Sequence, residues 1–381
     1  MAVSIAFHNM KKIGITGQHG FVGYHLYHTI SLLKEEFQLV DFNRSFFNDE
    51  QSLDSFVAKC DVIVHLAALN RHNDPEVIYK TNTGLVQQLI AALERTASKA
   101  HVLISSSTQE ERDNLYGKSK KEGRLAFADW ASKSGGTFTG LIIPNVYGPF
   151  GHPFYNSVVA TFCHQIAHNE TPKIEVDGQL KLIYVGEVVE AILQAIRMGD
   201  NSAEKVLAHS AEAKVSEILS LLQQFKSVYQ DKGEFPTLHN AFEHKLFNTY
   251  RCYMDILAYF PRKFVQHTDN RGAFVEIARH GIPGQTSFST TVPGITRGNH
   301  FHTRKIERFA VIRGKALIQL RRIGTSEVHN FYLDGDEPAY VDMPIWYTHN
   351  IQNIGTETLY TNFWINEPFD PADPDTYFEI V

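Results

Sequence analysis

Three side chains in one short stretch have the types and spacing needed to move a proton. The stretch ISSSTQEERDNLYGKSK (Ile104–Lys120) carries Ser107, Tyr116 and Lys120. On a helix, Tyr116 and Lys120 would lie one turn apart, and a lysine ammonium there lowers a phenol pKa from its usual ~10. A serine hydroxyl could orient the same substrate oxygen. The stretch predicts proton transfer at a sugar hydroxyl or carbonyl while another group moves a hydride. Because Tyr-x-x-x-Lys is also common as a plain surface pair, its surroundings must decide.

A glycine-rich turn follows the first apolar strand expected in the chain. The segment Lys11–Thr16 reads as a strand, and Gly17-Gln-His-Gly20-Phe21-Val22-Gly23 leads from it into a helical pattern. Glycines at this spacing let the backbone approach a pyrophosphate, which the free amides of the helix N-terminus can bind. The turn therefore predicts a dinucleotide site.

Two residues after the next expected strand give conflicting signals about which dinucleotide binds. Asp41 ends the strand Phe37–Val40 and could accept a hydrogen bond from the ribose 2′-hydroxyl of NAD. Arg44, three residues later, could pair with the 2′-phosphate of NADP. We favour NADP, because Arg44 lies in the loop whereas Asp41 lies deep at the strand end.

The order of the motifs resembles the extended short-chain dehydrogenase/reductase family that modifies nucleotide sugars. The matching stretches are T-G-x-x-G-x-x-G from Thr16, D-V-I-V-H-L-A-A from Asp61, the three serines, Y-G-K-S-K from Tyr116, and P-N-V-Y-G-P from Pro144. The resemblance implies a doubly wound parallel sheet and a catalytic set of Ser107, Tyr116 and Lys120. The predicted cofactor-binding residues are Gly17, Gly20, Phe21, Val22, Gly23, Asp41, Arg44, Leu66, Ala67, Ala68, Asn82, Lys120, Pro144 and Asn145. The predicted substrate-binding residues are Asn70, Ser107, Asn145 and Asn156.

Two positions depart from this family in a way that narrows the reaction. Sugar 4,6-dehydratases of the family carry an acidic pair directly after the catalytic hydroxyl, whereas this chain has Thr108 and Gln109. Neither side chain can act as an acid or base in dehydration. Reduction or epimerisation remains. Further along, Glu187 stands where an aspartate is more usual.

The chain after residue 262 has short alternating strands and turns, and it carries a second site. The segment from Gly294 to Gly314 resembles the first cupin motif, G-x5-H-x-H-x4-E-x6-G, and a second partial motif contains His349, with Trp346 at a usual glycine position. On a strand, His300 and His302 face the same side, and Glu307 and His349 could complete a divalent metal site. This ligand set suits zinc, manganese or iron, and we favour zinc. No motif identifies a proton-abstracting base, although Lys305, Tyr347 and Tyr360 are near the ligands.

Length and composition bound the remaining possibilities. With 381 residues we expect an α/β domain over residues 1–262 and an all-β cupin (jelly roll) over residues 263–381. A net charge of −6 argues against nucleic acid as a partner, and no apolar run is long enough to span a membrane. Three widely spaced cysteines follow no disulfide or zinc pattern, so we expect a cytoplasmic protein. A homodimer is the expected state.

A reductase followed by a cupin resembles a family of bacterial bifunctional enzymes of capsular polysaccharide synthesis. The segment Asp373–Phe378 (DPDTYF) adds to this match. The resemblance implies a UDP-4-keto-6-deoxy-N-acetylhexosamine substrate on the route to UDP-N-acetyl-L-fucosamine. The cupin would epimerise C3, and the reductase would use NADPH to reduce C4, giving a UDP-2-acetamido-2,6-dideoxy-L-talose. Two alternatives stay open: a nucleotide-sugar 4-epimerase with bound NAD and a cupin that only dimerises, and a regulatory UDP-sugar-binding protein.

Overall fold

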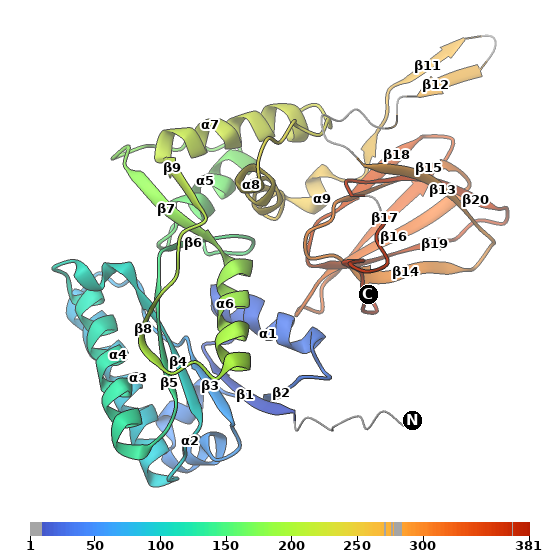
Figure 1. Ribbon diagram of the computed structural model, residues 1–381. Coiled ribbons are helices and arrows are strands. Elements are labelled where there is room, and N and C mark those ends of the chain that lie inside the picture. The colour runs from blue at the N-terminus through green and yellow to red at the C-terminus, as the bar shows by residue number, and fades with distance from the viewer. Residues whose placement is uncertain (1–9, 270–271, 276, 278–283, 368) are drawn as a thin grey trace, which may run out of the picture. The chain divides into compact units, whose positions relative to one another are not determined.

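The computed structural model describes residues 10–269, 272–275, 277, 284–367 and 369–381 (Figure 1). By contacts between residues the chain divides into two compact units, Met1–Val158 with Gly178–Lys214, and Val159–Asp177 with Val215–Val381. Among the described residues no helix is both long and apolar enough to cross a lipid bilayer.

The first unit is built on a six-stranded parallel sheet with helices on both faces (Figure 1). Its central strands β3 (Val62–His65) and β5 (Phe138–Ile143) are buried along their whole length and mostly apolar, as expected of strands covered on both faces. In spatial order the strands are β2 (Phe37–Val40), β1 (Lys11–Thr16), β3 (Val62–His65), β4 (His101–Ser107), β5 (Phe138–Ile143) and β8 (Ser202–Val206).

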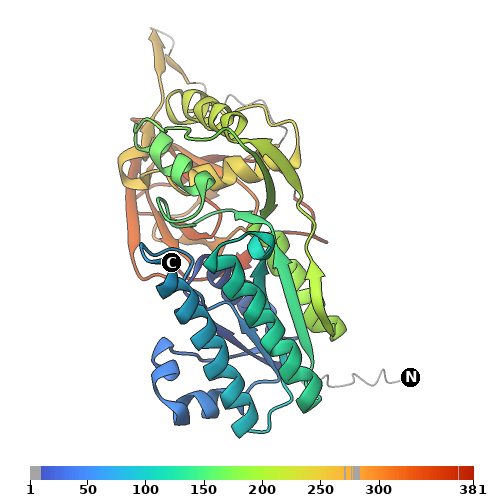
Figure 2. The same ribbon diagram turned by 90° about the vertical axis from the view of Figure 1, so that its left-hand side faces the viewer.

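Two hydrophobic cores, one on each face of the sheet, hold the helices in place. One core packs α1 (Phe21–Leu32) and α6 (Val185–Met198) against the sheet. The other packs α2 (Glu50–Val57), α3 (Pro75–Arg95) and α4 (Leu115–Ser134), and Figure 2 shows α3 and α4 side by side. The smaller elements of this unit are η1 (Arg44–Asn48), η2 (Thr108–Glu111), and a three-stranded sheet of β6 (Asn145–Tyr147), β7 (Gln179–Tyr184) and β9 (Ala211–Lys214).

The strand order reverses direction at β1, and this fixes where a ligand can bind. From β1 the chain runs outward to β2 and then returns to β3 on the other side of β1. In open parallel sheets the crevice for a ligand opens beyond the carboxyl ends of the strands at such a reversal. Gly17 follows β1 and Leu66 follows β3. The predicted doubly wound α/β fold is confirmed.

The second unit combines helices with two five-stranded antiparallel sheets. The predicted all-β region after the helices is confirmed as antiparallel sheets. The helical elements are α5 (Val158–Ala167), α7 (Val215–Phe225), η3 (Lys226–Gln230), α8 (Ala241–Arg251) and α9 (Ile256–Tyr259). One sheet contains β10 (Arg262–Lys263), β18 (Ala339–Met343), β15 (Glu307–Arg313), β20 (Leu359–Ile365) and β13 (Gln285–Thr291). The other contains β17 (Val328–Asp334), β16 (Lys315–Arg322), β19 (Tyr347–Asn353), β14 (Thr296–Phe301) and β21 (Tyr377–Phe378). A separate hairpin pairs β11 (Gln266–Asp269) with β12 (Gly272–Val275).

A buried ion pair links this unit's helices to its strands. Arg308 on β15 donates two hydrogen bonds to Asp342 on β18, at 2.7 and 2.9 Å, and the two residues are 2% and 0% exposed. The hydroxyl of Tyr229 in η3 donates to the same carboxylate at 2.6 Å, and Arg308 also donates to the carbonyl of Gly233 at 3.0 Å. Charges buried this deeply are tolerated because hydrogen bonds to neighbouring groups replace water.

We expect Asp342→Ala to lower the free energy of unfolding by about 3–5 kcal/mol, because Arg308 would keep a buried charge without a counterion. Urea denaturation of the purified protein measures this. Glu357→Ala removes an exposed carboxylate that pairs with Arg313 at 2.9 Å, and it should cost at most about 1 kcal/mol. Equal losses from the two substitutions would contradict the structural role given to the buried pair.

Candidate functional site

The predicted catalytic residues come together at the end of β4 and the start of α4. Ser107 is the last residue of β4, and its side chain hydrogen-bonds to Tyr116 in the first turn of α4. Lys120 lies one turn further along α4 and is buried. Gly117 permits this arrangement, because a Cβ there would lie 2.0 Å from the carbonyl oxygen of Gln109. Sequence reasoning assigned no role to Gly117.

Burial sets the protonation of this group and corrects one prediction. Burial raises the pKa of Tyr116 to about 12, with a further contribution from Tyr155 and an opposing hydrogen bond from Ser107. The sequence predicted that Lys120 would lower this pKa, and that is wrong for the protein alone because desolvation of the phenolate dominates. Burial also lowers the pKa of Lys120 to about 8, against the charge of Glu110. At neutral pH Tyr116 thus keeps its proton and can donate it.

A second buried ion pair, which sequence reasoning missed, fixes the loop between β4 and α4. Glu110 in η2 and Arg124 on α4 lie 2.7 Å apart, and each side chain is 5% exposed. Glu110 also accepts a hydrogen bond from Ser106. Although burial opposes ionisation, Arg124 and Ser106 lower the pKa of Glu110, so its carboxylate stays charged. Only the closeness of Glu110 to Ser107 in sequence could have drawn attention to it.

The glycine turn has the shape of a phosphate cradle. Gly17 has a φ of +80°, and the turn that it begins is closed by a 2.9 Å hydrogen bond from Gly20 N to Gly17 O. A Cβ on Gly23 would lie 2.1 Å from Gly17 O, so no larger residue fits beneath the turn. Gly20 caps α1 without a side chain, which leaves first-turn amides available to an anion. Phe21 and Val22 begin this helix and are half-buried.

The end of β3 is held beside the glycine turn by Thr16. Its hydroxyl lies 2.8 Å from Nδ1 of His65, and its backbone carbonyl accepts from Leu66 N at 3.0 Å. A Cβ on Gly17 would lie 2.7 Å from the nitrogen of Ala67, which shows how closely the two turns approach. The predicted cofactor residues Leu66, Ala67 and Ala68 are half-buried here.

Asn82 performs a structural task beside its predicted cofactor role. On α3 it accepts a hydrogen bond from Leu69 N at 2.7 Å and donates to Leu69 O and to the hydroxyl of Ser119, both at 3.1 Å. These contacts fix the loop after β3 against α4. Asp41 and Arg44 are both exposed after β2, and their predicted choice between NAD and NADP stays a prediction.

The predicted substrate residues are spread over several loops of the first unit. The backbone nitrogen of Asn70 donates to the hydroxyl of Tyr155 at 3.1 Å. After burial, Tyr155 makes a second contribution to the raised pKa of Tyr116. Asn145 follows the buried Pro144, and its exposed side chain donates to the carbonyl of Lys181 at 3.2 Å. Asn156 is exposed in the turn before α5. Tyr155 therefore joins two predicted sites, a role that its sequence did not reveal.

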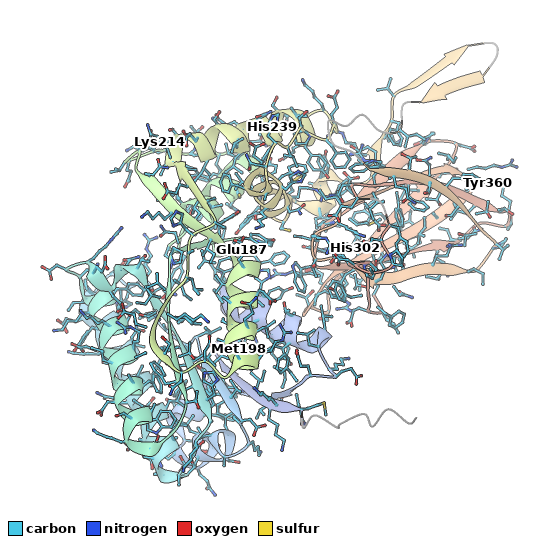
Figure 3. The ribbon with its side chains drawn as sticks, in the orientation of Figure 1. Glu187, Met198, Lys214, His239, His302 and Tyr360 are labelled. Carbon is cyan, nitrogen blue, oxygen red and sulfur yellow. The ribbon has the colours of Figure 1, made fainter. Side chains whose placement is uncertain are left out.

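Glu187 has a structural role in the same unit. Its side chain accepts hydrogen bonds from Tyr184 N at 2.9 Å and from the Ser210 hydroxyl at 2.5 Å, and so caps α6 (Figure 3). The Glu187 side chain thus reaches back to the backbone nitrogen of the N-cap residue, as in a capping box.

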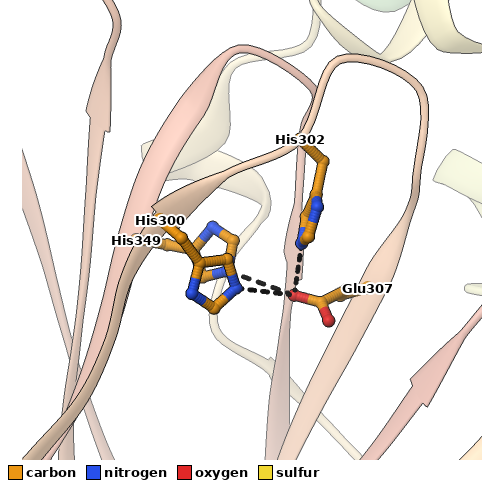
Figure 4. Close-up of side chains that lie close together, drawn as sticks. All are labelled: His300, His302, Glu307 and His349. Atoms are coloured by element: carbon orange, nitrogen blue, oxygen red, sulfur yellow. Dashed lines mark hydrogen bonds and ion pairs between the residues drawn. The ribbon is translucent and has the colours of Figure 1, made fainter. Parts of the chain in front are cut away.

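Four predicted metal ligands converge inside the antiparallel sheets of the second unit (Figure 4). His300 comes from β14, Glu307 from β15 and His349 from β19, and His302 follows β14. Glu307 Oε2 lies 3.1 Å from Nε2 of His302, 3.1 Å from Nε2 of His349 and 3.8 Å from Nε2 of His300. Donor atoms that share one tetrahedral zinc at 2.0–2.1 Å lie roughly 3.3 Å apart, so this spacing fits a metal ion.

The outer nitrogens of two of these histidines show why a cation suits the cluster. His302 Nδ1 faces the backbone carbonyl of Asp375, and His349 Nδ1 faces that of Tyr347 at 3.2 Å. A carbonyl only accepts, so each Nδ1 carries a proton and a neutral ring then presents a lone pair at Nε2. Both lone pairs face the carboxylate of Glu307. Although burial opposes its ionisation, the histidines hold the pKa of Glu307 well below its usual range. Although burial opposes it, Glu307 also raises the pKa of His302, so a proton satisfies this close approach in the protein without a metal. A divalent cation bound by the neutral rings would replace that proton.

Trp346 stands where the second cupin motif usually has a glycine, and its surroundings show how a tryptophan is accommodated there. Its φ is +62°, a left-handed conformation that glycine adopts at little cost. The indole is 6% exposed and stacks on Phe301 with ring centroids 5.6 Å apart, while its backbone nitrogen donates to His302 O at 2.7 Å. Packing and this hydrogen bond offset the strain, so the turn keeps the shape that a glycine would give it.

The three candidate bases near the ligands differ in position. Lys305 is 1% exposed and its Nζ donates to Pro374 O at 3.0 Å. Tyr347 is buried beside His349 at the start of β19. Figure 3 places Tyr360 at the rim of the sheets, apart from His302, so Tyr360 is the weakest candidate.

Comparison with known proteins finds a matching family for each of two parts of the chain. The NAD dependent epimerase/dehydratase family matches residues 13–207, more than half of the chain. The chain belongs to this family. A second family model, the polysaccharide biosynthesis C-terminal domain, matches residues 267–377 of the chain.

Two relatives match nearly the full length of this chain, and a third matches part of it. UDP-2-acetamido-2,6-beta-L-arabino-hexul-4-ose reductase from Pseudomonas aeruginosa is 31% identical over 372 residues, covering 96% of this chain and 98% of the relative. The crystal structure of the capsular polysaccharide assembling protein CapF from Staphylococcus aureus is 34% identical, with a TM-score of 0.62, and covers 97% of this chain and 100% of that one. The spore coat polysaccharide biosynthesis protein SpsL from Bacillus subtilis is 26% identical over 124 residues, covering 30% of this chain and 82% of the relative.

Proposed function

We propose that this chain is a bifunctional nucleotide-sugar enzyme that epimerises C3 of a UDP-4-keto-6-deoxy-N-acetylhexosamine and then reduces its C4 ketone with NADPH. The product would be a UDP-2-acetamido-2,6-dideoxy-L-talose on the route to UDP-N-acetyl-L-fucosamine, a precursor of bacterial capsule or O-antigen. The name of the P. aeruginosa relative, a hexul-4-ose reductase, supports a C4 ketone as the reacting group. The match to a capsular polysaccharide assembling protein supports the setting.

The observation that carries the reductase half is the Ser107–Tyr116 hydrogen bond with Lys120 one turn away, on the unit that holds the glycine cradle. Tyr116 would donate its hydroxyl proton to the C4 oxygen as C4 accepts a hydride from NADPH, leaving NADP⁺ and the C4 alcohol. Ser107 would orient the carbonyl. The ammonium of Lys120 would stabilise the phenolate that Tyr116 becomes, which burial otherwise disfavours.

The metal cluster supports the epimerase half. The C3 proton is acidic because it is alpha to the C4 ketone, so a base can remove it and reprotonation on the opposite face inverts C3. His300, His302, Glu307 and His349 would hold a divalent cation, zinc in our proposal. When bound, such a cation would supply positive charge near the ketone and so would lower the barrier to C3 deprotonation.

The Glu110–Arg124 pair supports ketone chemistry over dehydration. Glu110 is the first carboxylate after Ser107, and its ion pair holds it ionised and directed at Arg124. Loss of the C6 hydroxyl needs a general acid that holds a proton at working pH. An ionised Glu110 has no proton to give.

We expect the enzyme to be a cytoplasmic homodimer. All three cysteines, Cys60, Cys163 and Cys252, are free thiols, which suits a reducing compartment. Size-exclusion chromatography with light scattering tests the dimer.

The direct test mixes the protein with a UDP-4-keto-6-deoxy-N-acetylhexosamine made by its upstream dehydratase, with NADPH in one cuvette and NADH in another. We expect absorbance at 340 nm to fall in the NADPH cuvette, and faster than with NADH if Arg44 reads the 2′-phosphate. No oxidation of either nicotinamide by folded protein would contradict the reductase proposal. Turnover without added reductant by protein purified with NAD would favour the 4-epimerase, and binding without turnover would favour a regulatory protein.

A further inference from the structure

The segment Pro374–Glu379 lies along the part of the second unit that carries two proposed metal ligands. Strand β21 pairs with β14, which places Phe378 opposite His300 and Tyr377 opposite Phe301. Glu379 N donates to Asn299 O at 3.0 Å, and Thr348 donates to Glu379 O. The segment therefore borders His300, and also Thr348, the neighbour of His349. It contains part of the DPDTYF stretch, to which the proposed reactions assign no task.

Asp375 makes the densest contacts of this segment. Its carboxylate accepts hydrogen bonds from Thr303 N, Arg304 N and Lys305 N, each at 3.0 Å, and from the Thr303 hydroxyl at 2.6 Å. The residue is 2% exposed and adopts a φ of +41°. Three successive amides directed at one carboxylate form an anion nest. A charge buried at a strained backbone position is costly unless such contacts compensate it.

The loop that this carboxylate holds joins two of the ligands. Residues 303–306 connect His302 to Glu307, the first residue of β15. The position of both side chains depends on the path of this loop. The carboxylate of Asp375 binds its first three amides, so it fixes the path on the His302 side.

The backbone carbonyl of Asp375 acts on the same ligand directly. It accepts a hydrogen bond from Nδ1 of His302. This contact places the proton on Nδ1 and leaves the Nε2 lone pair facing Glu307, 3.1 Å away. Metal-binding histidines are commonly oriented by such an acceptor on the outer nitrogen, and its loss weakens metal binding.

We propose that Asp375 is a positioning residue of the metal centre: its carboxylate holds the loop Thr303–Lys305, and its carbonyl orients His302. This inference rests on the proposed metal site and adds a residue that does not itself bind the metal. The segment Pro374–Glu379 is then part of the machinery that pre-organises the ligands.

The test compares metal affinity in the full chain. Protein freed of metal by a chelator is titrated with Zn²⁺ in competition with a chromophoric chelator. We expect Asp375→Ala to weaken Zn²⁺ binding about 10–100-fold. Asp375→Asn should fall between Asp375→Ala and the natural protein, because its amide oxygen still accepts while its amide nitrogen opposes an N–H. The visible spectrum of the Co²⁺-substituted protein should change as His302 shifts.

Asp373→Asn is the matched control. It removes the same charge two residues away, from a side chain that is 68% exposed and pairs with Arg304 at 2.8 Å. Its Zn²⁺ affinity should stay within about twofold of the natural value, since exposed pairs contribute little. If Asp375→Ala does not fold, as judged by thermal melting of the metal-free protein, Asp375→Asn and Thr303→Ala carry the comparison.

Three outcomes separate this inference from the proposed function. Weaker Zn²⁺ binding by the Asp375 variants alone, with a metal-free melting temperature close to the control's, supports the positioning role. Unchanged Zn²⁺ affinity with a lower melting temperature overturns it and leaves the metal centre standing, because Asp375 would then only anchor the segment. No Zn²⁺ binding by the natural protein overturns the metal centre and this inference with it.

Discussion

Replacing Tyr116 with phenylalanine is expected to lower the rate of NADPH oxidation by about 10²–10⁴-fold, because the substitution removes the proton that C4 reduction consumes. The ring and its packing remain, so the fold should survive. Burial raises the pKa of Tyr116 to about 12, which leaves the natural residue protonated throughout the neutral range. Initial rates at saturating NADPH and 4-keto sugar measure the effect.

The Tyr116→Phe substitution should not change the reaction that we assign to the metal cluster. Exchange of the C3 hydrogen with deuterated water, followed by NMR of the 4-keto sugar, is expected to continue in Tyr116→Phe at the natural rate. Tyr79→Phe is a matched control, since its hydroxyl donates to Glu122 at 2.5 Å, between α3 and α4. If Tyr116→Phe oxidised NADPH at the natural rate, Tyr116 would have no role in the reduction. If the variant instead lost both NADPH oxidation and C3 exchange, one shared site would be the better explanation.

Replacing Glu307 with glutamine is expected to slow C3 exchange and to leave C4 reduction intact, the reverse of the effect of Tyr116→Phe. The substitution removes the only carboxylate in the described His300, His302, Glu307 and His349 cluster, and it leaves three imidazoles without their negative partner. Metal content measured by emission spectrometry should fall, and C3 exchange should slow by about 10²-fold or more, because a bound cation contributes several kcal/mol to stabilising developing charge.

A substrate that already has the inverted C3 should still be reduced by Glu307→Gln. Glu357→Gln, an exposed glutamate paired with Arg313, should match the natural protein in metal content and in exchange. Normal C3 exchange by a metal-free Glu307→Gln protein would contradict the role given to the cluster.

Local sequence patterns were sufficient where neighbouring residues determine the geometry. The glycine turn was predictable because Gly17, Gly20 and Gly23 act within one strand-to-helix connection, and the structure places them as a cradle. The pairing of His300 with His302 followed from the two-residue repeat of a strand. Glu307 and His349 were predictable from the cupin resemblance, and all four side chains converge.

Contacts between distant segments were beyond such reasoning. Nothing in the spacing of Glu110 and Arg124 shows that they meet, and nothing near Asp375 shows that it binds residues 303–305. The pKa of Tyr116 was misjudged because the sequence reveals the nearby Lys120 but not the extent of burial. The sequence shows Trp346 only as a departure from a motif, because its φ of +62° and its packing against Phe301 are properties of the folded chain.

The network around Arg308 has a consequence for how this protein could have been assembled in evolution. The partners of the Arg308–Asp342 pair include Tyr229 and Gly233, which precede the strands by many residues, and Phe235 packs on Trp364 with ring centroids 4.5 Å apart. A gene that acquired only the strands after residue 262 would encode an ion pair stripped of its hydroxyl and carbonyl partners. The helices of residues 215–260 and the two five-stranded antiparallel sheets are therefore expected to have been inherited together.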